Sequence, residues 1–227
     1  MATTAFHTGI FILPETITQK VTWLLRNYDL VLIATWEHLV LTVISVAVAL
    51  VISLAVGIVA ARNAAVYRIA LATTGVFYTI PSLALFAILI PIVGLGRVPA
   101  VIGLVGYSLL ALIRNIVTGI HGVPADVVEA AVGMGLTRRQ VLFRIELPLA
   151  LPVILAGVRV VTVTVIGIAT VAAYINAGGL GSLIFSGIAQ TNGPKIASGA
   201  IIASAMAVLA DWGLQRLQRR LVADAKA

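Results

Sequence analysis

The stretch that decides the fold is Leu39–Ala61, LVLTVISVAVALVISLAVGIVAA, a run of 23 residues without a charge. As a helix rising 1.5 Å per residue it would be about 34 Å long, which is enough to cross a hydrocarbon core of about 30 Å. The rest of the 227-residue chain has the same character, since 61% of its residues are hydrophobic and 10% are charged. A soluble domain carries about 25% charged residues. We therefore predict an all-α integral membrane protein, and the absence of cysteine excludes a disulfide scaffold.

Four further apolar stretches bring the expected number of spans to five. The second stretch, Ile69–Gly96, is interrupted by Pro81 and Pro91. Proline inside a span leaves a carbonyl group that needs another partner, so we expect this helix to be kinked and packed inside the bundle. The other spans are expected from about Val98 onward, from about Leu155 to Ile175, and from Ile196 to about Trp212.

The basic residues orient these spans. With five spans and a cytoplasmic C-terminus, nine Lys and Arg residues fall on the cytoplasmic side and four on the outer side. This asymmetry follows the positive-inside rule, so we expect the N-terminus outside and the C-terminus in the cytoplasm. The net charge of +7 then reflects membrane topology and not a nucleic-acid partner. Arg114 and Arg159 lie near the expected span ends, where the default expectation is that they extend to the membrane surface.

The N-terminal segment does not resemble a signal peptide, because it has no basic start and its apolar piece, Gly9–Leu13, is too short. Apolar residues at helical spacing from Ile17 to Val31 predict an amphipathic helix on the outer surface. We therefore divide the chain into an outer N-terminal segment (1–38), a transmembrane domain (39–215) with a cytoplasmic loop at 122–148, and a basic cytoplasmic tail (216–227).

The cytoplasmic loop carries strong local signals for a helical hairpin. Pro124 suits the start of a helix, and Gly133 and Gly135 suit its end. Thr137 and Gln140 then form the Thr-x-x-Gln pattern of a capping box, which predicts a second helix. A short capped helix held outside the membrane is typical of a docking element for another protein. An ordinary structured loop fits the architecture equally well.

A motif within this loop resembles the EAA signature of ABC-importer permeases. Its fixed positions are Glu129, Ala130, Ala131, Gly135, Ile145, Leu147 and Pro148, at the spacing of the signature. Four other stretches are similar to the permeases of importers for glycine betaine, choline, carnitine and related quaternary amines: Ile80–Phe86, Ile113–Gly119, Glu146–Gly157 and Ala177–Phe185. The resemblance covers residues 36 to 215.

This resemblance implies a type I (MetI-like) permease subunit of the bacterial inner membrane, with the seven motif residues coupling it to an ATPase. Its implied partners are a second, identical or related permease subunit, two ATPase subunits docked on the coupling helices, and an extracytoplasmic solute-binding protein. The chain would be a transport subunit and not an enzyme, with no cofactor of its own, and ATP and Mg would be bound by the ATPase. The sequence agrees, since it lacks the G-x-x-x-x-G-K-[ST] phosphate loop.

A quaternary ammonium group is usually held by aromatic faces. The candidate pore residues are therefore Pro81 of the second span, the aromatic side chains around it and one in the third span: Phe77, Tyr78, Phe86 and Tyr107. The candidate outer gate is the glycine-rich segment with Ala177, Gly178, Gly179 and Gly181, which could equally be a flexible turn. No metal site is expected, because His7, His38 and His121 lack a second ligand at metal spacing.

Three alternatives remain open. A permease for an amino acid of the methionine type would share the motif and the five-span plan. An ion-coupled secondary carrier would need a carboxylate deep in the membrane, and Glu37 and Asp211 are expected only at span ends. A membrane anchor that does not transport would have no need of an intact coupling motif.

Overall fold

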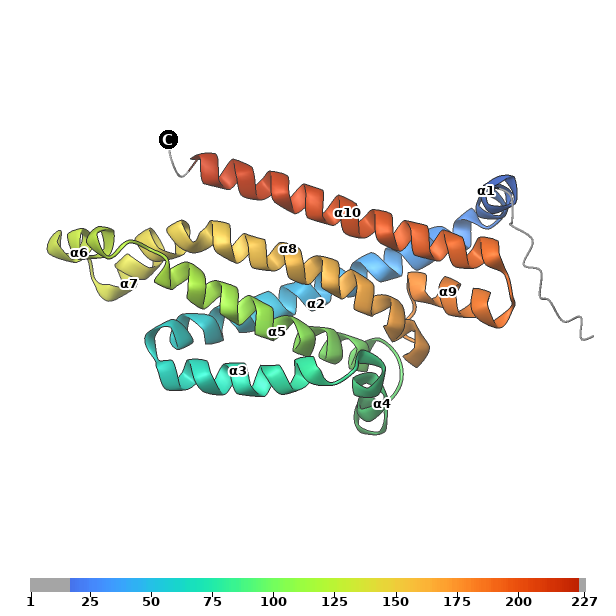
Figure 1. The fold of residues 1–227 in the computed structure, drawn as a ribbon, viewed down its shortest axis with the longest axis horizontal. Coiled ribbons are helices and arrows are strands. Elements are labelled where there is room, and N and C mark those ends of the chain that lie inside the picture. The colour runs from blue at the N-terminus through green and yellow to red at the C-terminus, as the bar shows by residue number, and fades with distance from the viewer. Residues whose placement is uncertain (1–16, 225–227) are drawn as a thin grey trace, which may run out of the picture.

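A computed structural model describes residues 17–224 of the chain. All of the regular elements in this part are helical (Figure 1). They are α1 (Ile17–Arg26), α2 (Tyr28–Arg62), α3 (Ala64–Thr79), α4 (Ser82–Val93), α5 (Arg97–His121), α6 (Ala125–Gly133), α7 (Arg138–Val141), the π-helix η1 (Leu142–Glu146), α8 (Leu147–Ala172), the 3-10 helix η2 (Ala173–Ile175), α9 (Leu180–Ala189) and α10 (Gly193–Asp224). The interpretations placed on Gly9–Leu13 and His7 lie outside the described residues.

Four helical stretches of the described chain are long and apolar enough to cross a membrane, and a fifth span is obtained if a bent helix pair is counted as one. The four are α2, α5, the continuous stretch Arg138–Ile175 and α10, and the pair is α3 with α4. Two of these helices extend beyond the spans expected from the sequence. The predicted boundaries at 38/39 and 215/216 both fall inside continuous helices, α2 and α10.

The second span differs most from its prediction. The chain turns by 100° between α3 and α4, so the expected single kinked helix is instead two separate helices. Pro81 explains the break, because a proline disfavours helical geometry in the residue before it, and Ile80 accordingly has an extended backbone (φ −71°, ψ 128°). The expectation that this span packs inside the bundle is also wrong for α3, where Thr74 is the only buried residue. Pro91, by contrast, is accommodated inside α4.

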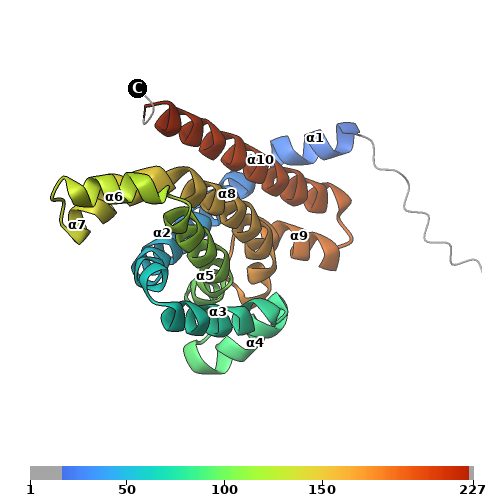
Figure 2. The ribbon, with the colours of Figure 1, turned by 60° about the vertical axis from the view of Figure 1, so that its left-hand side comes forward.

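Helix α5 forms the centre of the bundle and packs against α2, α3, α4 and α8 (Figures 1 and 2). Small residues let the helices approach closely at these contacts. A Cβ atom on Gly57 of α2 would lie 2.7 Å from Ile116 of α5, and one on Gly157 of α8 would lie 2.7 Å from Asn115. Helix α10 covers α8 and α9 on one side of this core.

The two ends of the bundle carry different structures. At one end, on the left of Figure 1, α6 and α7 form a hairpin that extends beyond the long helices. At the other end, α9 and the turn before it lie beside α2 and α8. The predicted amphipathic helix is present as α1, which ends at Arg26 and packs Trp23 and Leu24 against a cluster containing Ala203 of α10.

Candidate functional site: the α6–α7 hairpin and the outer turn

Helix α6 begins and ends where the local signals predicted. Pro124 precedes it, and Asp126 lies in its first turn, where the helix dipole favours a negative charge. At its end, Gly135 N–H donates to the Val132 carbonyl (2.9 Å) and Leu136 N–H donates to the Ala131 carbonyl (3.2 Å). This is the Schellman pattern, which needs a left-handed residue at the position of Gly135. Gly135 supplies it, with φ of +85°.

Helix α7 begins with the predicted capping box. The Gln140 backbone N–H donates to Thr137 Oγ1 (3.4 Å), and the Thr137 backbone N–H donates to Gln140 Oε1 (2.8 Å). Two backbone donors that a helix start leaves unpaired are thus satisfied. The turn between α6 and α7 is therefore defined by its own hydrogen bonds, with Gly135 and Thr137 at fixed positions.

The motif residues divide between the surface and the interior of the hairpin. Glu129 and Ala130 are exposed on α6, whereas Ala131 is buried. Glu129 has no ion pair with any of the side chains that the structure describes, so its carboxylate is available to a partner. Of the other motif residues, Gly135 and Pro148 are exposed and Ile145 and Leu147 are partly buried.

Large apolar side chains are exposed on the same hairpin. Val132 and Met134 have relative exposures of 57% and 74%, and Phe143 of the adjoining η1 has one of 55%. Exposed apolar side chains that lie close together, with polar groups around them, are typical of a protein–protein contact. The hairpin can therefore offer a partner an apolar surface together with the Glu129 carboxylate.

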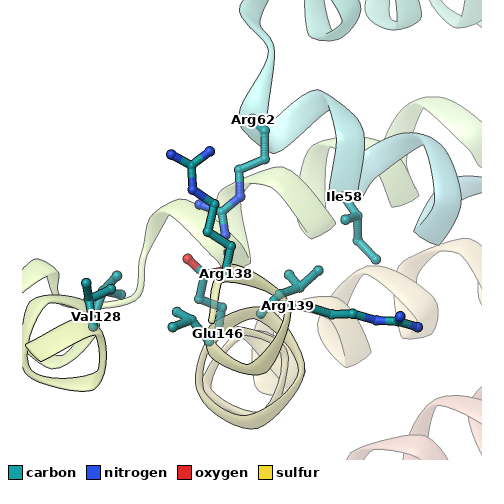
Figure 3. A pocket seen from close by; sticks show the side chains of 9 residues that line it. Ile58, Arg62, Val128, Arg138, Arg139 and Glu146 are labelled. Atoms are coloured by element: carbon teal, nitrogen blue, oxygen red, sulfur yellow. Dashed lines mark hydrogen bonds and ion pairs between the residues drawn. The ribbon is translucent and has the colours of Figure 1, made fainter. Parts of the chain in front are cut away.

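The chain enters α8 through the π-helix η1, and Glu146 at its end is nearly fully buried, with 3% exposure. Its carboxylate accepts a hydrogen bond from the Arg62 guanidinium, at the end of α2, and forms an ion pair with it. Beside this pair lies a cavity of about 500 Å³ between α2 and the hairpin, lined by Ile58 and Val128 among others (Figure 3). Sequence reasoning did not identify this pair, whose partners are 84 residues apart.

The two candidate pore tyrosines lie together at the break between α3 and α4. The rings of Tyr78 and Tyr107 are 6.2 Å apart and meet edge to face. The Tyr107 hydroxyl donates to the Ile80 carbonyl, so this tyrosine also fastens the residue before Pro81. Tyr78 is half exposed and Tyr107 is buried.

The cavity beside these tyrosines, lined also by residues of α8 such as Thr164, measures about 40 Å³. A buried water needs about 10–15 Å³ on the same measure, so the space admits only a few water molecules. A single subunit therefore has no room for a quaternary amine at this point. A site that includes Tyr78 would have to be completed by a surface from outside the chain.

The remaining pore candidates have different surroundings. Phe86 is fully buried in the main core and faces Gly103, where a Cβ atom would lie 2.6 Å from its ring. Phe86 therefore packs inside the subunit and does not reach a pore surface. Phe77 is 43% exposed, and Pro81 lies at the start of α4.

The glycine-rich segment after η2 is held firmly by α2. Gly179 N–H donates to Glu37 Oε2 (3.0 Å), and Leu180 N–H donates to His38 Nδ1 (3.3 Å). His38 Nε2 hydrogen-bonds to the Ile166 carbonyl (3.1 Å). Since Nδ1 accepts, the proton of this neutral ring lies on Nε2.

Backbone geometry adds to this restraint. Gly178 and Gly179 have φ of +82° and +79°, and Asn176 is left-handed with φ of 65°. A Cβ atom on Gly181 would overlap the Thr170 carbonyl, and Ala177 is buried. The segment 176–181 is thus a packed turn with defined hydrogen bonds, and we call it the outer turn after the side on which the sequence predicts it. Sequence reasoning missed Glu37 and His38, although two adjacent polar residues inside an apolar run were a signal for them.

Arg159 has partners that the sequence did not predict. It lies in the middle of α8, and its Nη2 and Nε atoms hydrogen-bond to Asp211 Oδ1 of α10 (2.9 and 3.0 Å). The pair joins α8 to α10. The expectation that Arg159 extends to the membrane surface stays a prediction. Arg114 is exposed, and its extension to the membrane surface stays a prediction.

Long apolar helices around α5, with an exposed capped hairpin at one end, define a multi-pass transport subunit of the inner membrane. The chain belongs to the family of binding-protein-dependent transport system inner membrane components, whose family model matches residues 53–223.

Curated relatives cover nearly the whole chain. It is 37% identical over 205 residues to the carnitine transport permease protein OpuCB of Listeria monocytogenes, covering 90% of this chain and 94% of that protein. It is 35% identical over 203 residues to the glycine betaine/carnitine/choline transport system permease protein OpuCB of Bacillus subtilis (strain 168), covering 89% of this chain and 94% of that protein.

Among solved structures, the fold is similar to that of a chain of the MetNI methionine ABC transporter in an inward-facing conformation. The TM-score is 0.79 at 24% identity, covering 86% of this chain and 98% of that chain. The predicted MetI-like permease fold is thereby confirmed.

Proposed function

We propose that the chain is the membrane-spanning subunit of an ATP-driven importer of a quaternary amine such as carnitine, choline or glycine betaine. The observation that carries the solute class is the 37% identity, over 90% of the chain, to a carnitine transport permease. The fold is compatible with a membrane-spanning subunit that works with a separate ATPase, because it provides spans and an exposed hairpin.

We further propose that the ATPase is a separate subunit, which binds ATP and Mg. It would contact the exposed Glu129 and Ala130 and the apolar side chains of the hairpin. An extracytoplasmic binding protein would deliver the solute at the opposite end. There the segment containing Gly178 and Gly179 would form part of the outer gate.

A second, identical or related permease subunit would complete the pore. Two observations support this proposal: the cavity beside Tyr78 and Tyr107 is too small for the solute, and Tyr78 is half exposed. Tyr78 would then present its ring to a quaternary ammonium group from the surface between two subunits.

A methionine-type amino-acid permease is the second candidate, favoured by the structural likeness to MetNI. That likeness concerns the fold, at 24% sequence identity. The two OpuCB permease proteins are 37% and 35% identical to this chain. An ion-coupled carrier would need a free carboxylate in the membrane, and the Asp211 carboxylate is paired with Arg159.

The test of function is uptake by cells that lack other importers for quaternary amines and express this chain with its ATPase and binding protein. Labelled carnitine, choline and glycine betaine should accumulate, vanadate should abolish uptake, and excess methionine should not compete. Uptake of methionine alone, or uptake that vanadate leaves unchanged, would contradict the proposal.

The proposed orientation has its own test. The chain has no cysteine, so a single one can be introduced at Val132, which is 57% exposed on α6. With a cytoplasmic hairpin, an impermeant thiol reagent added to intact cells should leave Val132→Cys unlabelled and should label it after the membrane is opened. Labelling of Val132→Cys in intact cells would contradict the proposed orientation.

A further inference from the structure

The hairpin is attached to the bundle in a restricted way. Helix α6 packs on α7 and η1, and η1 continues directly into α8. Between the hairpin and the end of α2 lies the cavity of about 500 Å³, so apolar packing does not fill this space. A displacement of α6 reaches α8 through the chain itself, and it can reach α2 through α5 and α8, which both pack against α2.

The Arg62–Glu146 pair adds a direct polar connection between η1 and the end of α2. Glu146 is buried, and among the described side chains Arg62 provides its one ion pair. A buried carboxylate without its partner is strongly unfavourable, so the Glu146 side chain holds Arg62 in place. Figure 3 shows the Arg62 side chain extending from the end of α2 toward Glu146, across the edge of the cavity.

The segment that carries Glu146 is itself unusual. Residues Leu142–Glu146 form a π-helix, and the Leu147 N–H donates to the Leu142 carbonyl. Such segments occur mostly as short interruptions of α-helices, frequently at functional sites. Here the interruption lies between the docking hairpin and α8, so the charge pair is placed where the hairpin joins the spans.

Helix α2 reaches from this pair to the outer turn. Arg62 is its last residue, and Glu37 and His38 in its outer half hold Gly179 and Leu180. The 24 residue-to-residue steps from His38 to Arg62 rise about 36 Å along the helix. One rigid element thus contacts both the hairpin and the outer turn.

We infer that Arg62 and Glu146 are positioning residues that transmit movement of the α6–α7 hairpin to α2, and through α2 to the outer turn. The inference rests on the proposed function, in which an ATPase moves the hairpin. Neither residue touches the solute or ATP in this account. Their role is to make the end of α2 move together with η1.

The test uses the assembled transporter with its ATPase and binding protein, and measures ATP hydrolysis with and without the solute-loaded binding protein. Arg62→Gln and Glu146→Gln should each keep basal hydrolysis and lower the stimulation by roughly fivefold or more, the usual range for coupling between sites. Arg62→Lys, which keeps the charge, should recover part of the stimulation. Arg68→Gln is the matched control, because Arg68 lies just beyond the same turn and has no ion pair with a described residue.

The double variant Arg62→Gln/Glu146→Gln separates this link from a general loss of stability. Residues that act as a pair should give a double variant no worse than either single one. Losses that add, or wild-type stimulation in both single variants, would overturn the inference. If the unmodified transporter takes up no quaternary amine but its hydrolysis is still stimulated by another loaded binding protein, the proposed solute fails and the link can still be measured.

Discussion

The two ends of the bundle use glycine in opposite surroundings. In the hairpin, Gly135 is exposed, has φ of +85° and has no atom within 4 Å of the position of a Cβ. In the outer turn, Gly178 would place a Cβ 2.5 Å from Glu37 Oε2, and Gly181 would overlap the Thr170 carbonyl. The hairpin therefore needs glycine for its backbone conformation alone. The outer turn needs it for close packing as well.

This difference fits two mechanical roles. The hairpin keeps its shape through its own hydrogen bonds and leaves its apolar side chains free for a partner. The outer turn is held by residues of other helices, namely Glu37 and His38 of α2 and the end of α8. Substitutions in the outer turn should accordingly lower stability, whereas substitutions in the hairpin should impair coupling to the ATPase.

The largest effect is expected at Gly181. In Gly181→Ala the new Cβ meets the Thr170 carbonyl, which is backbone and cannot rotate away, and Ala173 at 2.8 Å. Overpacking typically costs 1–3 kcal/mol, and we expect about 3 kcal/mol or more here because backbone must move. Thermal unfolding of the purified protein should show a large loss of stability.

The matched control for this prediction is Gly167→Ala. Gly167 lies in α8 with no atom within 4 Å of its Cβ position, so this change should be neutral or stabilise the helix by up to about 1 kcal/mol. Equal stabilities for the two alanine variants would show that the outer turn is not tightly packed.

The next effect is expected at Gly135 and should appear in coupling. A left-handed backbone costs a residue with a Cβ roughly 1–2 kcal/mol, and a branched side chain more. Gly135→Val should therefore displace α6 while the spans insert normally, and both solute uptake and stimulated hydrolysis should be lost. Gly135→Ala should be milder.

Gly133→Val controls for side-chain size. Gly133 is also exposed and also has free space around its Cβ position, but it lies inside α6 without a positive φ. This variant should retain most of its transport. If Gly135→Val transports at the normal rate, the turn does not require glycine, and the hairpin's shape is not what transmits force.

The same contrast explains what the sequence could predict. The hairpin follows from local signals: Pro124, Gly135, and the reciprocal bonds of Thr137 and Gln140 lie within a few residues of one another. The bonds of the outer turn join residues 142 positions apart, Glu37 with Gly179 and His38 with Leu180. No local pattern contains that information.

The helices α2 and α10 run past the predicted span boundaries for a related reason. Charged and polar residues were taken to end the apolar helices, yet Glu37, His38 and Asp211 lie inside them because distant partners satisfy their polar groups. The 100° turn at Pro81 was expected only as a kink. Proline predicts that a helix is interrupted there, but the angle depends on how α4 packs against α5.

A smaller effect is expected at Tyr107, between the two ends. Its hydroxyl donates to the Ile80 carbonyl, so Tyr107→Phe leaves a carbonyl unpaired beside Pro81. The expected loss is about 1 kcal/mol, measured by thermal unfolding. Tyr78→Phe should be neutral, because the Tyr78 ring keeps its edge-to-face contact and its hydroxyl has no partner among the described residues. Equal losses would mean that the Ile80 bond contributes nothing.

The smallest effect is expected at Thr137, which caps α7. Thr137→Ala removes the acceptor of the Gln140 N–H, and loss of such a cap costs about 0.5–2 kcal/mol. We expect the low end, because the bond is 3.4 Å long and lies on an exposed turn where water can replace it. Stimulated hydrolysis should fall slightly, without the collapse expected for Gly135→Val. Thr137→Ser, which keeps the hydroxyl, should behave as the unmodified protein. If Thr137→Ala instead uncouples the transporter as fully as Gly135→Val, the cap and not the glycine turn sets the hairpin's shape. The division between conformational and packing glycines then no longer holds for the hairpin.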